Sequence, residues 1–179
     1  MFSISEAKAR GFSHSRIYRM AKAGKLEKLA PNVYKYPSVL IDPVAESFAV
    51  ACKRLGPDAA VAGPSALGHR GLVESPPQQL WMLVPPNILA PRRSNYRLIR
   101  SRSDLSLHMK SYRYFRVTSL ERTLVELLHL ATKIGPEAGI RAIREAVADG
   151  RTTLDQMVGV AKDLGYQKSI SKYWEAILI

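Results

Sequence analysis

The chain has 179 residues, of which 46% are apolar and 23% are charged, a composition typical of a folded protein rather than a disordered one. A single cysteine permits no internal disulfide, four scattered histidines argue against a zinc cluster, and no stretch reaches the roughly 20 apolar residues of a membrane span. The N-terminus also lacks the apolar core of a secretion signal, so we expect a cytoplasmic protein with no membrane partner.

The net charge of +12 is concentrated in two blocks. Residues 1–37 carry eight Lys or Arg and two acids, and residues 91–118 carry eight Lys or Arg and one acid. Residues 38–90 have a net charge of −1, and residues 119–179 have a net charge of zero. Two basic blocks on a nearly neutral body indicate surfaces that bind polyanions.

The first 24 residues predict two short helices. Ser3 and Glu6 have the spacing of a capping box, and Gly11 suits the left-handed end of the first helix. Ser13 is placed to cap a second helix that ends at Gly24. The second helix has one apolar stripe, formed by Ile17, Met20 and Ala21. Its cap and its opposite, polar side supply the candidate DNA contacts Ser13, His14, Ser15, Arg16, Arg19 and Lys22.

A basic hairpin is expected after these helices. Residues 25–29 and 32–36 flank a turn at Ala30-Pro31 and predict two short strands. Two helices joined by a glycine-containing turn and followed by such a hairpin are typical of a winged helix-turn-helix, whose second helix enters the DNA major groove. The hairpin adds three candidate DNA contacts, Lys28, Asn32 and Lys35. A helical hairpin whose basic face is only solvated is the alternative.

Three segments resemble one protein family. The run SEAKARGFSHSRIYRMAKAGKLEKLAPNVYKYP is similar to the winged-helix start of AbiEi-type antitoxins of type IV toxin–antitoxin systems, which act in abortive infection, a form of phage defence. The segments AAVAGPSALGHRGL and VTSLERTLVELL resemble later parts of that family. The resemblance implies an N-terminal module that represses the protein's own operon by binding operator DNA. It also implies a second domain that counteracts a nucleotidyltransferase-like toxin, with or without a stable complex.

One departure from the family concerns the start of the module. The winged helix of the family normally has another helix before this point, whereas Met1 lies almost on the first cap. Residues 1–37 therefore have too few large apolar groups to fold alone. We expect their apolar face to pack on the second domain, on a twin subunit in a homodimer, or on a helix upstream of Met1. The candidate partner in the second domain is the last predicted helix, with Tyr173, Trp174 and Ile177.

The overall expectation is an α+β fold, with a winged helix-turn-helix at residues 1–37 and a mixed domain at residues 38–179. Pro37 and Pro43 bracket the linker between them. The second domain is expected to hold a small sheet followed by C-terminal helices. Predicted helices span residues 43–55, 66–70, 136–148, 153–164 and 170–179, with another beginning after a cap at Ser119. Predicted strands span residues 59–62, 79–84, 96–99 and 112–117.

The second basic block has two interpretations. It comprises Arg92, Arg93, Arg97, Arg100, Arg102, Lys110, Arg113 and Arg116. Tyr96, Tyr112 and Tyr114 lie among these residues, and the mixture of cations and aromatic faces is typical of single-stranded nucleic-acid binding. Basic residues on sheet edges also discourage aggregation, and the sequence favours neither interpretation.

An enzyme is the alternative of another class. A nuclease needs converging carboxylates on a metal, and the candidates are Asp104, Glu121 and Glu126, with His108, Lys110 and His129. Their spacing fits no such site: Glu121 and Glu126 do not share a helix face, and Glu126 with His129 is interpreted as a solvated helix side. Cys52 lies on an apolar helix side and is predicted to be buried.

These patterns lead to one hypothesis and two alternatives. The sequence predicts no catalytic residue, metal or cofactor, and favours a sequence-specific DNA-binding antitoxin. A transcriptional regulator without a toxin partner is the first alternative. A metal-dependent nuclease is the second.

Overall fold

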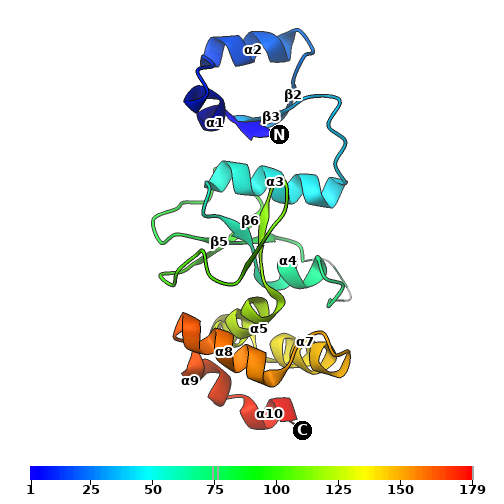
Figure 1. Ribbon diagram of the computed structural model, residues 1–179, viewed down its shortest axis with the longest axis vertical. Coiled ribbons are helices and arrows are strands. Elements are labelled where there is room, and N and C mark those ends of the chain that lie inside the picture. Colours follow the sequence, from blue (N-terminus) through cyan, green and yellow to red (C-terminus); the bar gives the residue numbers. More distant parts are fainter. Residues whose placement is uncertain (74, 76, 179) are drawn as a thin grey trace.

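The computed structural model describes residues 1–73, 75 and 77–178. The molecule is elongated and has three tiers (Figure 1). An N-terminal module forms one end, and a sheet with α3 (Pro43–Leu55) and α4 (Gly63–Gly68) forms the middle. The helices from α5 (Leu120–His129) to α10 (Trp174–Leu178) form the other end. The C-terminus lies at one end of the molecule, whereas the N-terminus lies on the inner side of the N-terminal module, toward the middle tier (Figure 1).

The N-terminal module contains two helices and a three-stranded antiparallel sheet. Its elements are β1 (Phe2–Ser3), α1 (Ile4–Ala9), α2 (His14–Lys22), β2 (Glu27–Ala30) and β3 (Val33–Lys35), with strand order β1-β3-β2. The sequence did not predict β1, which pairs with β3 beyond the predicted hairpin. Ile4, Ala7, Ile17, Leu26 and Tyr34 form the buried core of the module.

Local hydrogen bonds define both helices as predicted. The Ser3 hydroxyl accepts the Glu6 backbone N–H at 3.2 Å, and the Glu6 carboxylate accepts the Ser3 N–H at 2.8 Å, which confirms the capping box. The Ser13 hydroxyl accepts the Arg16 N–H at 3.3 Å, so this cap is also confirmed. Gly11 and Gly24 follow the two helices with φ of +83° and +71°, a conformation that favours glycine.

The module rests on α3 (Pro43–Leu55), which lies between it and the sheet (Figure 1). Strands β1 and β3 contact α3, and Met1 packs against the cluster that α3 covers. The predicted docking of the last helix onto the module is therefore wrong. That segment forms α9 (Gln167–Ser171) and α10 (Trp174–Leu178), and α10 packs on α7 (Glu137–Ala148). Residue 179, which ended the predicted helix, lies outside the described residues.

The second body is built on a mixed five-stranded sheet. Its strands are β4 (Ala60–Val61), β5 (Leu80–Val84), β6 (Tyr96–Arg100), β7 (Met109–Ser111) and β8 (Arg116–Thr118), in the order β6-β5-β4-β8-β7. The predicted strand at residues 112–117 is wrong in part, because Tyr112 and Phe115 close the turn between β7 and β8. The short helix α4 (Gly63–Gly68) begins three residues before its predicted start at residue 66.

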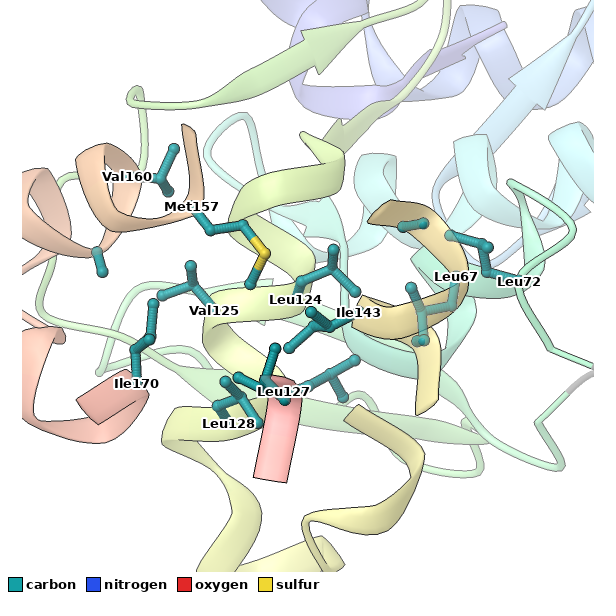
Figure 2. Close-up of a cluster of buried hydrophobic side chains, with 14 of the residues drawn as sticks. Leu67, Leu72, Leu124, Val125, Leu127, Leu128, Ile143, Met157, Val160 and Ile170 are labelled. Carbon is teal, nitrogen blue, oxygen red and sulfur yellow. The ribbon is translucent and has the colours of Figure 1, made fainter. Parts of the chain in front are cut away.

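Helix α5 (Leu120–His129) is the centre of the C-terminal tier. The hydroxyl of Ser119 caps it, as predicted, by accepting the Arg122 N–H at 3.1 Å. Figure 2 shows Leu124, Val125, Leu127 and Leu128 of α5 among side chains of the surrounding helices. Those helices are α6 (Ala131–Ile134), α7, α8 (Leu154–Leu164), α9 and α10. Because α5 is packed on several sides, it joins the sheet to these helices.

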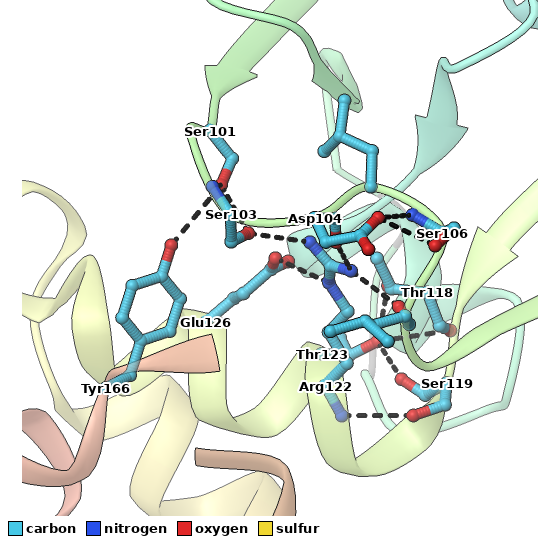
Figure 3. A network of polar contacts seen from close by, with 12 residues as sticks. Ser101, Ser103, Asp104, Ser106, Thr118, Ser119, Arg122, Thr123, Glu126 and Tyr166 are labelled. Carbon is cyan, nitrogen blue, oxygen red and sulfur yellow. Dashed lines mark hydrogen bonds and ion pairs between the residues drawn. The ribbon is translucent and has the colours of Figure 1, made fainter. Parts of the chain in front are cut away.

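A buried polar network ties α5 to the loop between β6 and β7 (Figure 3). Arg122 is fully buried and donates to the Glu126 carboxylate at 2.9 Å, to the Asp104 carbonyl at 3.0 Å and to the Leu107 carbonyl at 2.5 Å. Its guanidinium also lies 3.2 Å from the Ser103 hydroxyl. Glu126 is 2% exposed, so the prediction that it lies on a solvated helix side is wrong.

Candidate nucleic-acid interface

Helix α2 presents one polar and basic face to solvent. Ile17 is buried in the module, and Met20 and Ala21 pack beside it, so the predicted apolar stripe is confirmed. The side chains opposite this stripe are exposed, and with the cap they comprise Ser13, His14, Ser15, Arg16, Arg19 and Lys22. Tyr18 was not among the predicted contacts, but it is 52% exposed and lies among these residues.

Two cations on α2 lie against aromatic rings. The Arg16 guanidinium is 4.9 Å from the centroid of the Phe12 ring, and the Lys22 ammonium is 5.3 Å from that of Tyr18. Cation–π contacts of this kind hold a long side chain near the helix surface. The Phe12 ring, in the turn that precedes α2, therefore helps to orient Arg16, whose side chain is exposed.

Two of the three side chains predicted to contact DNA in the hairpin after α2 are exposed. The hairpin turn lies at Pro31 and Asn32, one residue later than predicted, with Asn32 at φ +66°. Asn32 and Lys28 are exposed. Lys35 is a correction to the predicted set, because its ammonium pairs with Glu46 of α3 at 2.5 Å and with Glu27 at 3.5 Å. Its side chain is only 12% exposed, so Lys35 fastens the hairpin to α3.

A second ion pair fastens α1 to the same helix. The Lys53 ammonium of α3 contacts the Glu6 carboxylate at 2.5 Å, while Glu6 also caps α1. Burial alone would raise the pKa of Glu6, but the hydrogen bonds from Lys53 and Ser3 outweigh it, so the pKa lies below its usual value. Together with the contacts of β1 and β3 on α3, the two ion pairs connect the module, and thus α2, to the second body.

The second basic block is not one patch. Arg92, Arg93, Arg97, Arg100 and Arg102 lie on or near β6, at one edge of the sheet, whereas Lys110, Arg113 and Arg116 lie on β7, β8 and their turn, at the other edge. The eight residues therefore form two separate surfaces rather than one patch. Arg116 is half-buried and donates to the carbonyls of Pro57 at 3.2 Å and Leu105 at 2.7 Å, which makes it a structural residue.

Tyrosines in this block already have partners. Tyr112 stacks on Phe115 with 4.7 Å between ring centroids, and the Lys110 ammonium lies 5.4 Å from the Tyr112 ring. Arg113 lies over Tyr114 at 5.2 Å. Because these rings contact side chains of the protein itself, the geometry weighs against a platform on which single-stranded bases stack.

Comparison with known proteins bears on the first segment. Residues 1–37 match the model of a family described as "Transcriptional regulator, AbiEi antitoxin". This segment is similar to AbiEi antitoxin regulators. The match ends just after β3, so it covers α1, α2 and the hairpin that carry the candidate interface. The search among curated proteins found no match to the sequence.

A solved structure resembles a larger part of the chain. The crystal structure of the RV2827C protein from Mycobacterium tuberculosis matches with a TM-score of 0.50 and 18% sequence identity. The alignment covers 81% of this chain and 59% of that protein. At this identity the likeness shows a shared fold, and the chain spans less than two thirds of that protein's length.

The candidate nuclease residues do not converge on one site. Glu126 pairs with Arg122, His108 pairs with Asp163 at 2.8 Å, and the Asp104 carboxylate accepts hydrogen bonds from Ser106. Burial raises the pKa of Glu126, while Arg122 acts to lower it. In residues 1–73, 75 and 77–178, no three His, Cys, Asp or Glu side chains group as metal ligands.

Two further features of the described residues concern reactivity and membranes. The prediction that Cys52 is buried is confirmed, because it is 8% exposed in the cluster beneath α3. Burial also raises the pKa of its thiol, which disfavours the nucleophilic thiolate. None of the helices in this part of the chain has the length and apolar character needed to cross a bilayer.

Proposed function

We propose that this protein is a sequence-specific DNA-binding antitoxin that represses its own operon through a winged helix-turn-helix. The observation that carries the proposal is α2, whose apolar stripe is buried while its basic, hydroxylated face is exposed in the segment that matches the antitoxin regulators. A helix of this kind enters the major groove with its N-terminal residues at the base edges. The protein acts in the cytoplasm, on double-stranded operator DNA.

The proposed contacts divide into base-reading and phosphate-binding groups. Arg16 and Arg19 reach the base edges, where an arginine donates two hydrogen bonds to a guanine. Ser13, His14 and Ser15 at the start of α2 contact bases or the adjacent sugar-phosphate backbone. Lys22 and the exposed hairpin residues Lys28 and Asn32 bind phosphates and set the position of the helix on the duplex.

The second body, from residue 38 onward, serves the antitoxin role in this proposal by counteracting a nucleotidyltransferase-like toxin. The family that residues 1–37 match is described as an antitoxin, which supports an antitoxin role for the protein. The protein is proposed to do so without catalytic activity, metal or cofactor. This part is tested by coexpressing the protein with a nucleotidyltransferase that is encoded beside it and is toxic when expressed alone. Restored growth of the host cells is the expected result. If growth is not restored while operator binding persists, the protein is a regulator without that toxin partner.

The DNA-binding proposal is tested by substitutions on α2. Arg16→Ala and Arg19→Ala are expected to weaken binding to a duplex selected from a random library by the wild-type protein, by about 1–3 kcal/mol for an arginine bonded to guanine. Binding to random duplex should change much less. Arg141→Ala, which removes an exposed charge from α7 at the opposite end of the molecule, is the matched control. Equal losses on selected and random duplexes would show that α2 does not read bases.

A further inference from the structure

A groove of about 570 Å³ lies where the N-terminal module meets the second body. The residues that line it include Ser5 and Lys8 of α1, His14 at the start of α2, Asn32 in the hairpin turn and Arg54 at the end of α3. The loop after β5 completes it at Pro91. The groove thus connects the start of the proposed recognition helix with a segment almost 80 residues away in the sequence.

The lining of this groove suits an anion. Lys8 is exposed, and Arg54 is held in place because its guanidinium lies 5.5 Å from the ring centroid of Tyr96. Ser5 and Asn32 add neutral hydrogen-bond donors. Lys53, which also lines the groove, is paired with the Glu6 carboxylate at 2.5 Å, and no acidic side chain is among the described residues of the lining.

The loop at Pro91 continues the positive surface. It forms a tight turn, because the Ser94 N–H donates to the Pro91 carbonyl at 3.2 Å and the Ser94 hydroxyl donates to it at 2.6 Å. This turn presents Arg92 and Arg93, which are both exposed, with Arg93 at φ +57°. Residues 91–94 are therefore a defined basic turn that begins at the wall of the groove.

We propose that the operator's sugar-phosphate backbone runs from the start of α2 across this groove to the turn at residues 91–94. Arg54, Arg92 and Arg93 then bind phosphates outside the sequence-reading contacts of α2. The inference rests on the proposed function and extends it, because it makes the second body part of the DNA interface. The physical reason is continuity: the phosphates that flank the major groove continue past the N-terminal end of a recognition helix, and cations bind them there.

Salt dependence of duplex binding by the full chain tests the inference. The double variant Arg92→Gln/Arg93→Gln should reduce the slope of log K against log salt concentration by about 2 units, at about 0.9 per phosphate contact. It should also weaken selected and random duplexes by the same factor. The control Arg141→Gln/Lys168→Gln removes the same charge from exposed sites on α7 and α9 and should leave the slope unchanged.

A single variant of Arg54, on the α3 side of the groove, tests the same inference without changing the turn at residues 91–94. Arg54→Gln should reduce the slope by about 1 unit while the protein keeps its circular dichroism spectrum. The inference is overturned if wild-type protein selects its duplex and both groove variants bind it as the control does, and the proposed function then stands. Failure of the wild-type protein to bind any duplex overturns both. A slope change seen with single-stranded RNA but not with duplex would assign the turn to RNA and overturn the inference.

Discussion

Replacing Arg122 by Met is expected to destabilise the protein more than any other single change in α5. The substitution removes the 2.9 Å partner of Glu126, whose side chain is 3% exposed, and leaves a buried carboxylate without a counter-charge. Breaking a buried pair from one side typically costs about 3–5 kcal/mol. Two loop carbonyls, those of Asp104 and Leu107, also lose a donor. Because domains of this size are stable by about 5–15 kcal/mol, the loss is a large fraction of the total.

A double-mutant cycle separates the ion pair from the packing of the two side chains. Glu126→Met alone should also destabilise, since it leaves the buried guanidinium without its acid. The double variant Arg122→Met/Glu126→Met should recover several kcal/mol of the summed losses, because it buries no uncompensated charge. Urea unfolding followed by circular dichroism measures the four free energies of unfolding. If the two losses simply add, or if Arg122→Met costs less than about 1 kcal/mol, the network does not hold α5 to the loop as described.

The same variant has a characteristic pH dependence. Burial raises the pKa of Glu126, and Arg122 is the group that lowers it. Arg122→Met should therefore raise the pKa of Glu126 in the folded protein further above the ordinary carboxyl value of 4.5. The folded variant then holds a proton that the unfolded chain releases. The stability that this bound proton contributes is complete below pH 4.5 and is lost as the pH rises through the pKa of Glu126 in the folded protein. The loss in free energy of unfolding caused by Arg122→Met should therefore be smaller in acid.

Two further predictions concern the ends of the molecule. The pKa of Glu6 lies below 4.5, so the contribution of its carboxylate to stability is complete above that pH and is lost as the pH falls through the pKa of the folded protein's Glu6. Glu6→Gln should remove this part of the acid sensitivity, as measured by urea unfolding at different pH values. An unchanged dependence of the unfolding free energy on pH would contradict the prediction. Deleting Trp174–Leu178 should lower the Tm but leave the duplex affinity of the folded protein unchanged, because α10 packs on α7; a folded truncation that lost binding would argue against this arrangement.

Helix boundaries were predictable where the signal is local. The caps at Ser3, Ser13 and Ser119 each join a side chain to a backbone N–H three residues later, so a short stretch of sequence contains the whole interaction. Pairing between distant segments has no such signal. Strand β1 has two residues and is defined by hydrogen bonds to β3, about 30 residues away, so no pattern within Phe2 and Ser3 indicates it.

The strand order explains why the second basic block does not form one patch on the surface. Eight cations within residues 91–118 are close in the sequence, but the order β6-β5-β4-β8-β7 sends them to opposite edges of the sheet. Nothing in the local sequence specifies that order. The burial of Glu126 did leave a signal: Leu124, Val125, Leu127 and Leu128 cover more than one face of α5, which indicates a helix packed on several sides. A charged residue on such a helix needs a buried partner, and Arg122 lies four residues before it.

The ion pairs between the N-terminal module and α3 affect how DNA binding by this protein depends on salt concentration. The Glu6–Lys53 and Lys35–Glu46 pairs add charge interactions to the contacts of β1, β3 and Met1 with the second body, and both pairs have partly exposed members. The electrostatic screening length shortens from about 10 Å at 0.1 M salt to about 3 Å at 1 M. Added salt therefore weakens these ion pairs at the same time as it weakens DNA binding that depends on counterion release. Once these pairs weaken, we expect the exposed linker at residues 36–38 to let α2 change its tilt relative to the second body. A plot of log K against log salt is then straight only while the module stays fastened, and its bend marks the ionic strength at which the two parts begin to move separately.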